Sequence, residues 1–224
     1  MRPVERGTSE ETFKEYQDAK GLLLDRLGQY CSYCERHFPG GLAVEHIQPK
    51  DTNSDLELEW GNFLLSCINC NSTKKNKTIR LDDFFWADKH NTLLAFEYKD
   101  GGLIGVNPNL DEQKQRRAKR TLELFGLEKR PPRNADAGDL RWRNRGLAWD
   151  LAQEERQELI ESDTPSHRAK IVKIAVLRGF WSVWMTVFKD DSDMLERFIN
   201  AFPGTANCFD PTTFQPVPRV GGLL

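Results

Sequence analysis

The sequence predicts an α+β fold, with strands in the first half of the chain and a helical second half. Three observations indicate this arrangement. Short apolar runs alternate with paired cysteines over residues 30–77, two β-rich runs flank an Asp-Gly turn in residues 92–108, and a helical periodicity follows. We therefore divide the 224-residue chain into a domain of residues 1–108 and a helical region of residues 109–224.

The composition is that of an ordinary globular protein without a strong charge bias. Charged residues make up 29% of the chain, hydrophobic residues make up 38%, and the net charge is −2. Contact with nucleic acid therefore has to come from local clusters of Lys and Arg. The polar N-terminus lacks the apolar core of a secretory signal, and we expect a reducing, cytoplasmic compartment. The most apolar stretch, residues 171–188, contains Lys173 and Arg178, which favours a buried helix over a membrane span.

Two elements of the first half can be placed from local signals. Residues 9–28 predict an N-terminal helix, with Ser9 as its cap, several leucines on its apolar face and Gly28 after its end. Residues 92–108 predict a β-hairpin, because an Asp-Gly turn matches the twist of paired strands.

Four helices are expected in the second half. They cover residues 110–127, 139–162, 165–188 and 192–202. Gly126 is placed to end the first of them, and Thr164 with Pro165 is placed to begin the third. The Pro pair in residues 128–138 indicates a linker, and the tail from Thr205 is expected to be extended or loosely ordered. The tryptophans of this half are expected in the helical core: Trp142, Trp149, Trp181 and Trp184.

Two cysteine pairs predict a structural zinc site. Cys31 and Cys34 form one C-x-x-C, and Cys67 and Cys70 form another. Each such turn presents two thiolates, so that two turns complete a tetrahedral site. The alternative of two unrelated buried cysteine pairs is less favoured. Cys208 stands alone and is expected to be a packed free thiol.

A polar cluster lies inside the loop that the zinc would close and directly after it. Glu45 and His46 occur in VEHIQPK, Asn62 follows in a turn, and Asn71 follows the second cysteine pair. A lone histidine on an apolar strand is most often a satisfied core residue, but these neighbours favour metal-dependent phosphodiester hydrolysis. A neutral imidazole can take a proton from water, and carboxylate and amide oxygens suit Mg²⁺ or Mn²⁺. Nearby lysines are expected to contact nucleic acid: Lys50, Lys74, Lys75 and Lys77.

The order of these motifs over residues 31–77 resembles the HNH, or ββα-metal, endonucleases with a four-cysteine zinc site. The resemblance implies that His46 is the general base, that Asn62 orients it, and that Glu45 and Asn71 bind the catalytic cation. Glu45 stands where the commoner residue is Asp, and Asn71 stands where it is His. Asparagine makes the cation's ligands all oxygen, which favours Mg²⁺ or Mn²⁺ over softer ions.

Further segments, among them MRPVERG, FFWADKHNT and DLRWRNR, resemble the PtuB-type HNH subunits of Septu antiphage defence systems, including those joined to retrons. This resemblance implies a bacterial cytoplasmic nuclease that works with the ABC-type ATPase PtuA, and in the retron form with a reverse transcriptase and its msDNA. Two alternatives stay open, a standalone restriction-type nuclease and a non-catalytic zinc module that binds nucleic acid or protein. Duplex DNA, single-stranded DNA and tRNA all stay open as substrates.

Two further features are ambiguous from the sequence. His90 is expected in a turn or packing role. A basic helix face could be a solvated surface, a nucleic-acid track or a site for an acidic partner: Lys114, Arg116, Arg117, Lys119 and Arg120.

Overall fold

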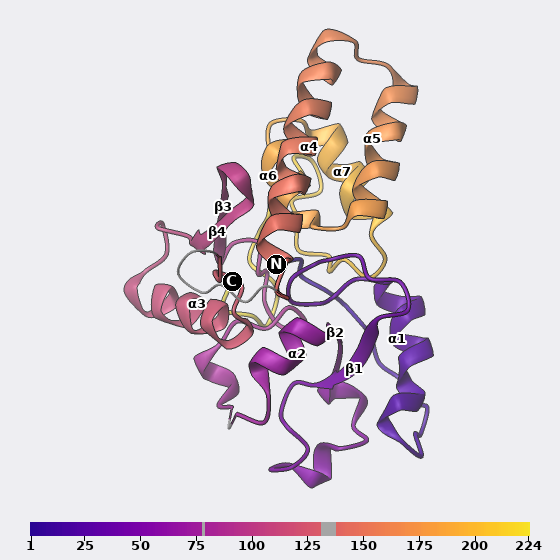
Figure 1. Ribbon diagram of the computed structural model, residues 1–224, viewed down its shortest axis with the longest axis vertical. Coiled ribbons are helices and arrows are strands. Elements are labelled where there is room, and N and C mark those ends of the chain that lie inside the picture. The colour runs from indigo at the N-terminus through magenta and orange to yellow at the C-terminus, as the bar shows by residue number, and fades with distance from the viewer. Residues whose placement is uncertain (78, 131–137) are drawn as a thin grey trace.

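The computed structural model describes residues 1–77, 79–130 and 138–224. Its elements confirm the α+β class, with small sheets and a helical second half (Figure 1). Most of the expected linker, residues 128–138, lies outside the described residues. Within the described ranges, no helix has both the length and the apolar character needed to cross a membrane.

Two antiparallel strands and a helix carry the motif region. Strand β1 (Leu42–His46) pairs with β2 (Phe63–Cys67), and α2 (Ile68–Lys74) follows β2 directly. The register sets Leu42 opposite Cys67 and His46 opposite Phe63. The second cysteine pair therefore lies at one end of the strand pair, and the histidine lies at the other.

The N-terminal helix is shorter than the sequence indicates. A 3₁₀ turn at Tyr16–Ala19 leads into α1 (Lys20–Leu27), and residues 9–15 are not helical. The Ser9 hydroxyl accepts a hydrogen bond from the amide two residues on, which closes a local turn instead of capping a helix. The expected helix start at Ser9 was therefore wrong, whereas its end before Gly28 is confirmed.

The expected hairpin is confirmed as β3 (Phe96–Lys99) paired with β4 (Leu103–Val106). Its turn contains Gly101 and Gly102, both with positive φ. A Cβ on Gly102 would lie 2.5 Å from the carbonyl oxygen of Arg145, so glycine is what lets α4 (Arg141–Glu161) approach the turn.

The helical half contains α3 (Glu112–Phe125), α4 (Arg141–Glu161), α5 (Pro165–Arg178), α6 (Trp181–Val187) and α7 (Ser192–Ala201). Gly126 ends α3 in the left-handed conformation, and Thr164 caps α5, as expected. The helix predicted over 165–188 is broken in two. Gly179 has a φ of 74°, and a Cβ there would lie 2.5 Å from the amide nitrogen of His37. The Phe180 amide donates to the Glu35 carbonyl at 2.9 Å, so the first half of the chain pairs with the backbone at the break.

The two halves share one hydrophobic core. Trp149, Trp181 and Trp184 are buried in it and Trp142 is half-buried, and helices α4 and α6 pack together beside the hairpin (Figure 1). The buried carboxylate of Glu35 accepts hydrogen bonds from the Tyr98 hydroxyl at 2.9 Å and the Ser182 amide at 2.7 Å, so it joins three segments. The division into two domains at residue 108 stays a prediction. Residues from both sides of it pack in the same hydrophobic core.

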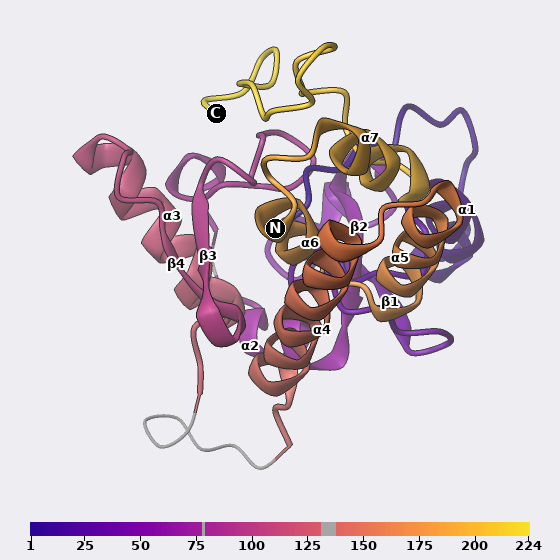
Figure 2. The ribbon, with the colours of Figure 1, turned by 90° about the horizontal axis from the view of Figure 1, so that it is seen from above.

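The C-terminal tail is more ordered than expected. Residues 205–224 run across the outside of the molecule as the yellow trace in Figure 2. The Asn91 side chain donates to the carbonyl oxygens of Cys208 and Val217, both at 2.8 Å, and its amide donates to Leu224 at 2.9 Å. The thiol of Cys208 is buried, and burial raises its pKa to about 11, as suits a packed free cysteine.

Candidate active site

The four cysteines of the two C-x-x-C turns converge on one point. Their sulfur atoms all lie within 4.8 Å of one another, and the sulfurs of Cys34 and Cys67 are 3.7 Å apart. Four ligands at a Zn–S distance of about 2.3 Å form a tetrahedron with edges of about 3.8 Å. All four side chains are buried free thiols. The donor set and its spacing therefore fit a structural zinc ion, as the sequence predicts.

A buried arginine from α4 lies beside this cluster. Arg141 donates to the Cys70 sulfur at 3.1 Å and to the Phe125 carbonyl at 2.7 Å, and it pairs with Asp139. A guanidinium next to four zinc thiolates offsets part of their negative charge. This contact has no local signal in the sequence, because Arg141 lies 71 positions after Cys70.

One small cavity joins the strand end to the helix. Glu45, His46 and Asn71 all line this space of about 160 Å³. Neighbouring residues on a strand point to opposite faces, but β1 ends at His46 and the chain turns away before Pro49. The end of the strand is therefore what lets both members of the Glu-His pair reach the same cavity.

The imidazole of His46 is held in one orientation. Its Nε2 lies 2.9 Å from the carbonyl oxygen of Glu57, which can only accept, so Nε2 carries the proton. The ring packs edge-on against Tyr16 and Phe63, with centroids 4.8 Å and 5.3 Å away. In the neutral ring, Nδ1 is left with a free lone pair.

The surroundings of the His46 imidazole favour its neutral form. Burial lowers the pKa of His46 below its ordinary value of 6.5, and the charges of Lys50 and Lys74 lower it further. The ring is thus a proton acceptor at neutral pH. The fixed orientation and the lowered pKa of His46 suit the expected role of general base, which stays a prediction.

Asn62 fixes the loop that follows β1. Its Oδ1 accepts from the Gln48 amide at 2.8 Å, and its Nδ2 donates to the carbonyls of Gln48 at 2.9 Å and Leu56 at 3.2 Å. The residues it holds lie two places after His46 and one before Glu57. Asn62 thus holds the backbone that follows His46 and the backbone that precedes Glu57, and it does not contact the imidazole ring itself.

Lys74 is placed differently from the expectation that it contacts nucleic acid. Its side chain is buried, 1% exposed, because its ammonium lies 2.6 Å from Glu45 Oε1 and donates to the His46 carbonyl at 2.7 Å. The other oxygen of Glu45 accepts from the Tyr33 hydroxyl. Burial raises the pKa of Glu45, and Lys74 and Tyr33 oppose that shift. A phosphate contact for Lys74 is therefore wrong in this arrangement, since the side chain faces inward.

The remaining residues of the cluster lie at the rim. Asn71 and Lys75 are exposed and line the cavity, Lys50 is half-buried and pairs with Glu57 at 2.6 Å, and Lys77 is exposed outside the cavity. Asp51 also lines the cavity, which the sequence alone did not indicate. The rim thus offers two lysines to an anion and further oxygen ligands to a cation.

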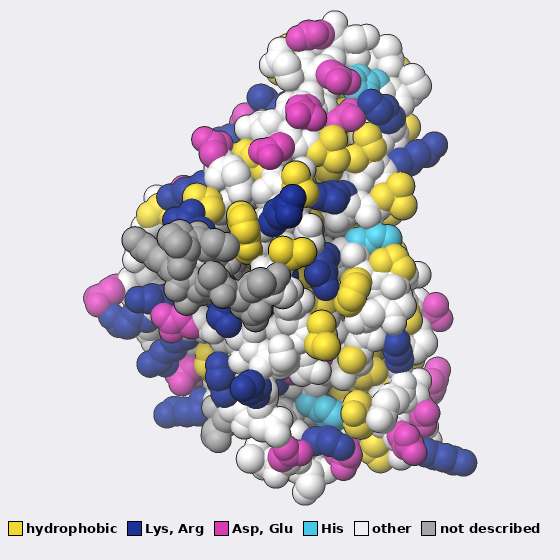
Figure 3. All heavy atoms as spheres, viewed as in Figure 1, with side chains coloured by type: hydrophobic (Ala, Val, Ile, Leu, Met, Phe, Trp, Pro, Cys, Tyr) yellow, Lys and Arg dark blue, Asp and Glu magenta, His cyan; other side chains and the backbone are white. Residues whose placement is uncertain are grey.

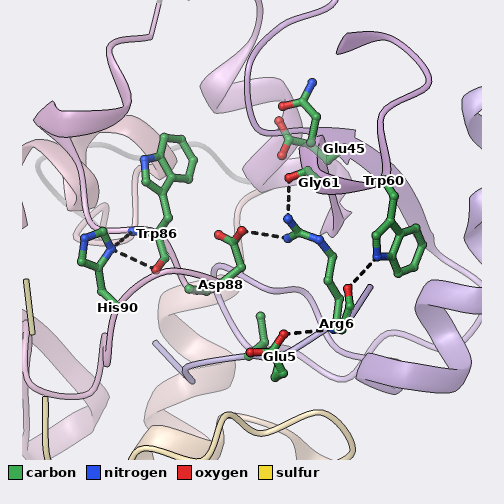
Figure 4. Close-up of polar contacts among 12 residues, drawn as sticks. Glu5, Arg6, Glu45, Trp60, Gly61, Trp86, Asp88 and His90 are labelled. Atoms are coloured by element: carbon green, nitrogen blue, oxygen red, sulfur yellow. Dashed lines mark hydrogen bonds and ion pairs between the residues drawn. The ribbon is translucent and has the colours of Figure 1, made fainter. Parts of the chain in front are cut away.

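The N-terminal segment braces the turn that precedes β2 (Figure 4). Arg6 donates to the Gly61 carbonyl and pairs with Asp88 at 2.8 Å, and the Trp60 indole donates to the Gly7 carbonyl at 2.8 Å. Because Asn62 ends this turn, Arg6 and Gly7 support the loop clamp, which is the set of hydrogen bonds from the Asn62 side chain to the backbone of Gln48 and Leu56.

A second, larger cavity of about 800 Å³ lies beside the loop clamp. Asn62 and Gln48 line it, whereas Glu45 and His46 do not. His90 lines it as well and accepts the Trp86 amide at 3.1 Å, which confirms its turn role.

The basic face of α3 is engaged within the chain. Four of its residues pair with acidic partners, and Arg117 lies over the Phe85 ring. Figure 3 shows Lys and Arg side chains scattered among acidic ones over one face, without a continuous basic field. These contacts favour the solvated-surface interpretation of this helix.

Comparison with known proteins agrees with the geometry. Residues 31–77, which hold the cysteine cluster and the cavity, match the family model of the HNH endonucleases. The match thus covers the part of the chain that holds both the cysteine cluster and the small cavity.

A segment of 58 residues is also 40% identical to the Septu protein PtuB of Bacillus thuringiensis. That segment covers 25% of this chain and 23% of that protein, so the similarity is confined to about a quarter of each.

Proposed function

We propose that this protein is a metal-dependent HNH endonuclease that hydrolyses phosphodiester bonds. One observation carries the proposal. The Nε2 proton of His46 is held by a backbone carbonyl, which leaves the lone pair of Nδ1 to accept a proton. Glu45 and Asn71, whose side-chain oxygens can bind a cation, line the same cavity as His46. Pure nucleic-acid binding needs no such combination, which disfavours a non-catalytic zinc module.

The residues divide the chemistry among themselves. His46 Nδ1 takes a proton from the attacking water, and the Glu57 carbonyl stabilises the imidazolium that forms. Asn62 keeps that carbonyl in place through the loop backbone. Glu45 and Asn71 would hold a Mg²⁺ or Mn²⁺ ion, which supplies charge stabilisation for the phosphate and the leaving oxygen. Lys50 and Lys75 lie at the rim, where a phosphate would approach.

The test is cleavage by the zinc-loaded protein with Mg²⁺ or Mn²⁺ and with EDTA. His46→Ala should lower cleavage by at least about a hundredfold while zinc content and melting temperature stay near wild type. His167→Ala is the matched control, because His167 lies at the start of α5, away from the cavity. Normal cleavage by His46→Ala would contradict the assignment, and binding in EDTA with no cutting in either metal would support the non-catalytic module.

We further propose that the nuclease is the effector of a Septu-type antiphage complex in the bacterial cytoplasm, together with an ABC-type ATPase of the PtuA kind. The partial similarity to PtuB supports this assignment. Co-expression with an ABC-type ATPase of the PtuA kind should give one complex that survives gel filtration. Separate elution would favour a standalone restriction-type nuclease, and co-elution with a reverse transcriptase and its msDNA would favour the retron form.

A further inference from the structure

Lys74 is the one lysine among the described residues whose side chain is buried. It ends α2, since Lys75 leaves the helix with a φ of 52°, and it points back under the strand. Its ammonium contacts the Glu45 carboxylate and the His46 main-chain carbonyl together, at 2.6 Å and 2.7 Å. A buried ammonium is costly unless paired, so this placement is specified by both contacts.

We propose that Lys74 is a positioning residue that keeps the catalytic cation weakly bound until a phosphodiester enters the site. This inference rests on the proposed nuclease function and concerns the affinity of Glu45 for a divalent cation. Lys74 neutralises the carboxylate that would otherwise attract the ion, and it occupies one of the two oxygens. Tyr33 donates to the other oxygen, which weakens the carboxylate as a ligand further.

The charges around the cavity support this. Besides Glu45 and Lys74, its lining includes the carboxylate of Asp51 and the ammonium groups of Lys50 and Lys75. These charges leave no net negative charge for a divalent cation in the free protein. A phosphodiester adds one negative charge and its own oxygens, and Mg²⁺ in proteins is commonly bound by one or two carboxylates together with substrate phosphates. The cation and the nucleic acid should therefore bind cooperatively.

The Lys74 side chain also fixes how Glu45 and His46 lie relative to each other. Its contact with the His46 carbonyl holds the strand end, while its contact with Glu45 holds the neighbouring side chain. Helix α2 is anchored four residues earlier by Cys70 of the zinc cluster. The zinc thus holds the helix that carries Lys74, and Lys74 holds the Glu-His pair.

The first test measures Mn²⁺ binding to zinc-loaded protein at pH 8, by the loss of the electron paramagnetic resonance signal of free Mn²⁺. Lys74→Met should tighten Mn²⁺ binding by about tenfold or more, because a positive charge next to the ligand is removed. Lys74→Arg keeps the charge and should stay within about twofold of wild type. In the double variant Glu45→Gln with Lys74→Met, the gain should be lost. Unchanged Mn²⁺ affinity in a folded Lys74→Met protein would overturn the proposal.

A second test needs no change at Lys74, which keeps the proposal open to refutation if Lys74→Met does not fold. In His46→Ala protein, where cleavage is blocked, a short DNA duplex or a short RNA strand is added to the same Mn²⁺ titration. At least one should tighten Mn²⁺ binding about tenfold, and no effect from either would overturn the proposal. The cleavage assay with wild-type protein separates this proposal from the nuclease function. If nucleic acid tightened Mn²⁺ binding but the wild-type protein cut neither DNA nor RNA, the nuclease function alone would be contradicted.

Discussion

Asn62→Ala should weaken both the fold and the catalytic base, although Asn62 touches neither the base nor the zinc cluster. The Asn62 side chain is buried, 5% exposed, and makes three hydrogen bonds to the backbone of Gln48 and Leu56. At roughly 0.5 to 1.5 kcal/mol for each bond, the loss of stability should be about 1.5 to 4.5 kcal/mol. Alanine leaves the backbone groups of a part-buried loop without their partners, which favours the upper half of that range.

Urea unfolding of the zinc-loaded protein measures the first effect, and cleavage assayed well below the unfolding midpoint measures the second. Catalysis should fall because Leu56 precedes Glu57, whose carbonyl holds the His46 ring. Asn107→Ala is the matched control. Asn107 also makes side-chain to backbone bonds, to Leu94 and Asn109, but outside the loop clamp. If Asn62→Ala kept full activity and lost no more stability than Asn107→Ala, the clamp would have no role.

Three further predictions follow from the same geometry. Because the pKa of His46 is lowered, kcat/KM should rise with pH and reach its half-maximum below pH 6.5, and a midpoint above pH 6.5 would contradict a neutral base. Acidification through the same range should also destabilise the fold, since His46 binds protons more readily in the unfolded chain. Cys67→Ser should lose zinc and cooperative unfolding together, measured by metal analysis and circular dichroism, and a stable, zinc-free, active variant would exclude the structural role. Gly179→Ala should cost about 2 kcal/mol or more in urea unfolding, since its φ of 74° and its approach to His37 are both incompatible with a Cβ. Gly21→Ala, with open space around it, is the control and should not destabilise.

The zinc cluster could be predicted from the sequence because its information is local. Each C-x-x-C turn sets two sulfurs close together, and the Ser32 amide, which donates to the Leu65 carbonyl at 2.8 Å, joins the first turn to the strand that carries the second. The hairpin, the α3 stop at Gly126 and the Thr164 cap were predictable for the same reason, since a turn or cap depends on a few adjacent residues. The match of residues 31–77 to the HNH endonucleases confirms the interpretation of these motifs.

The errors concern residues whose placement depends on distant contacts. Lys74 looks like a surface lysine of a basic run, and only the packing of α2 on β1 turns it inward to Glu45. The break at Gly179 depends on the close approach of His37, 142 positions earlier, and helical periodicity carries no sign of it. Tyr33 and Arg141 were missed because Tyr33 fills an unspecified position of the first C-x-x-C turn and Arg141 is far along the chain from Cys70, so neither contact has a local signal.

The most direct test of the central claim is a crystal structure of zinc-loaded His46→Ala protein with Mn²⁺ and a nucleic-acid strand, with the ion located by its anomalous scattering. We predict one Mn²⁺ in the small cavity between Glu45 and Asn71, in contact with a phosphate oxygen, and separate from the zinc of the four cysteines. A phosphate bound elsewhere, with no Mn²⁺ in that cavity at saturating concentration, would contradict the account.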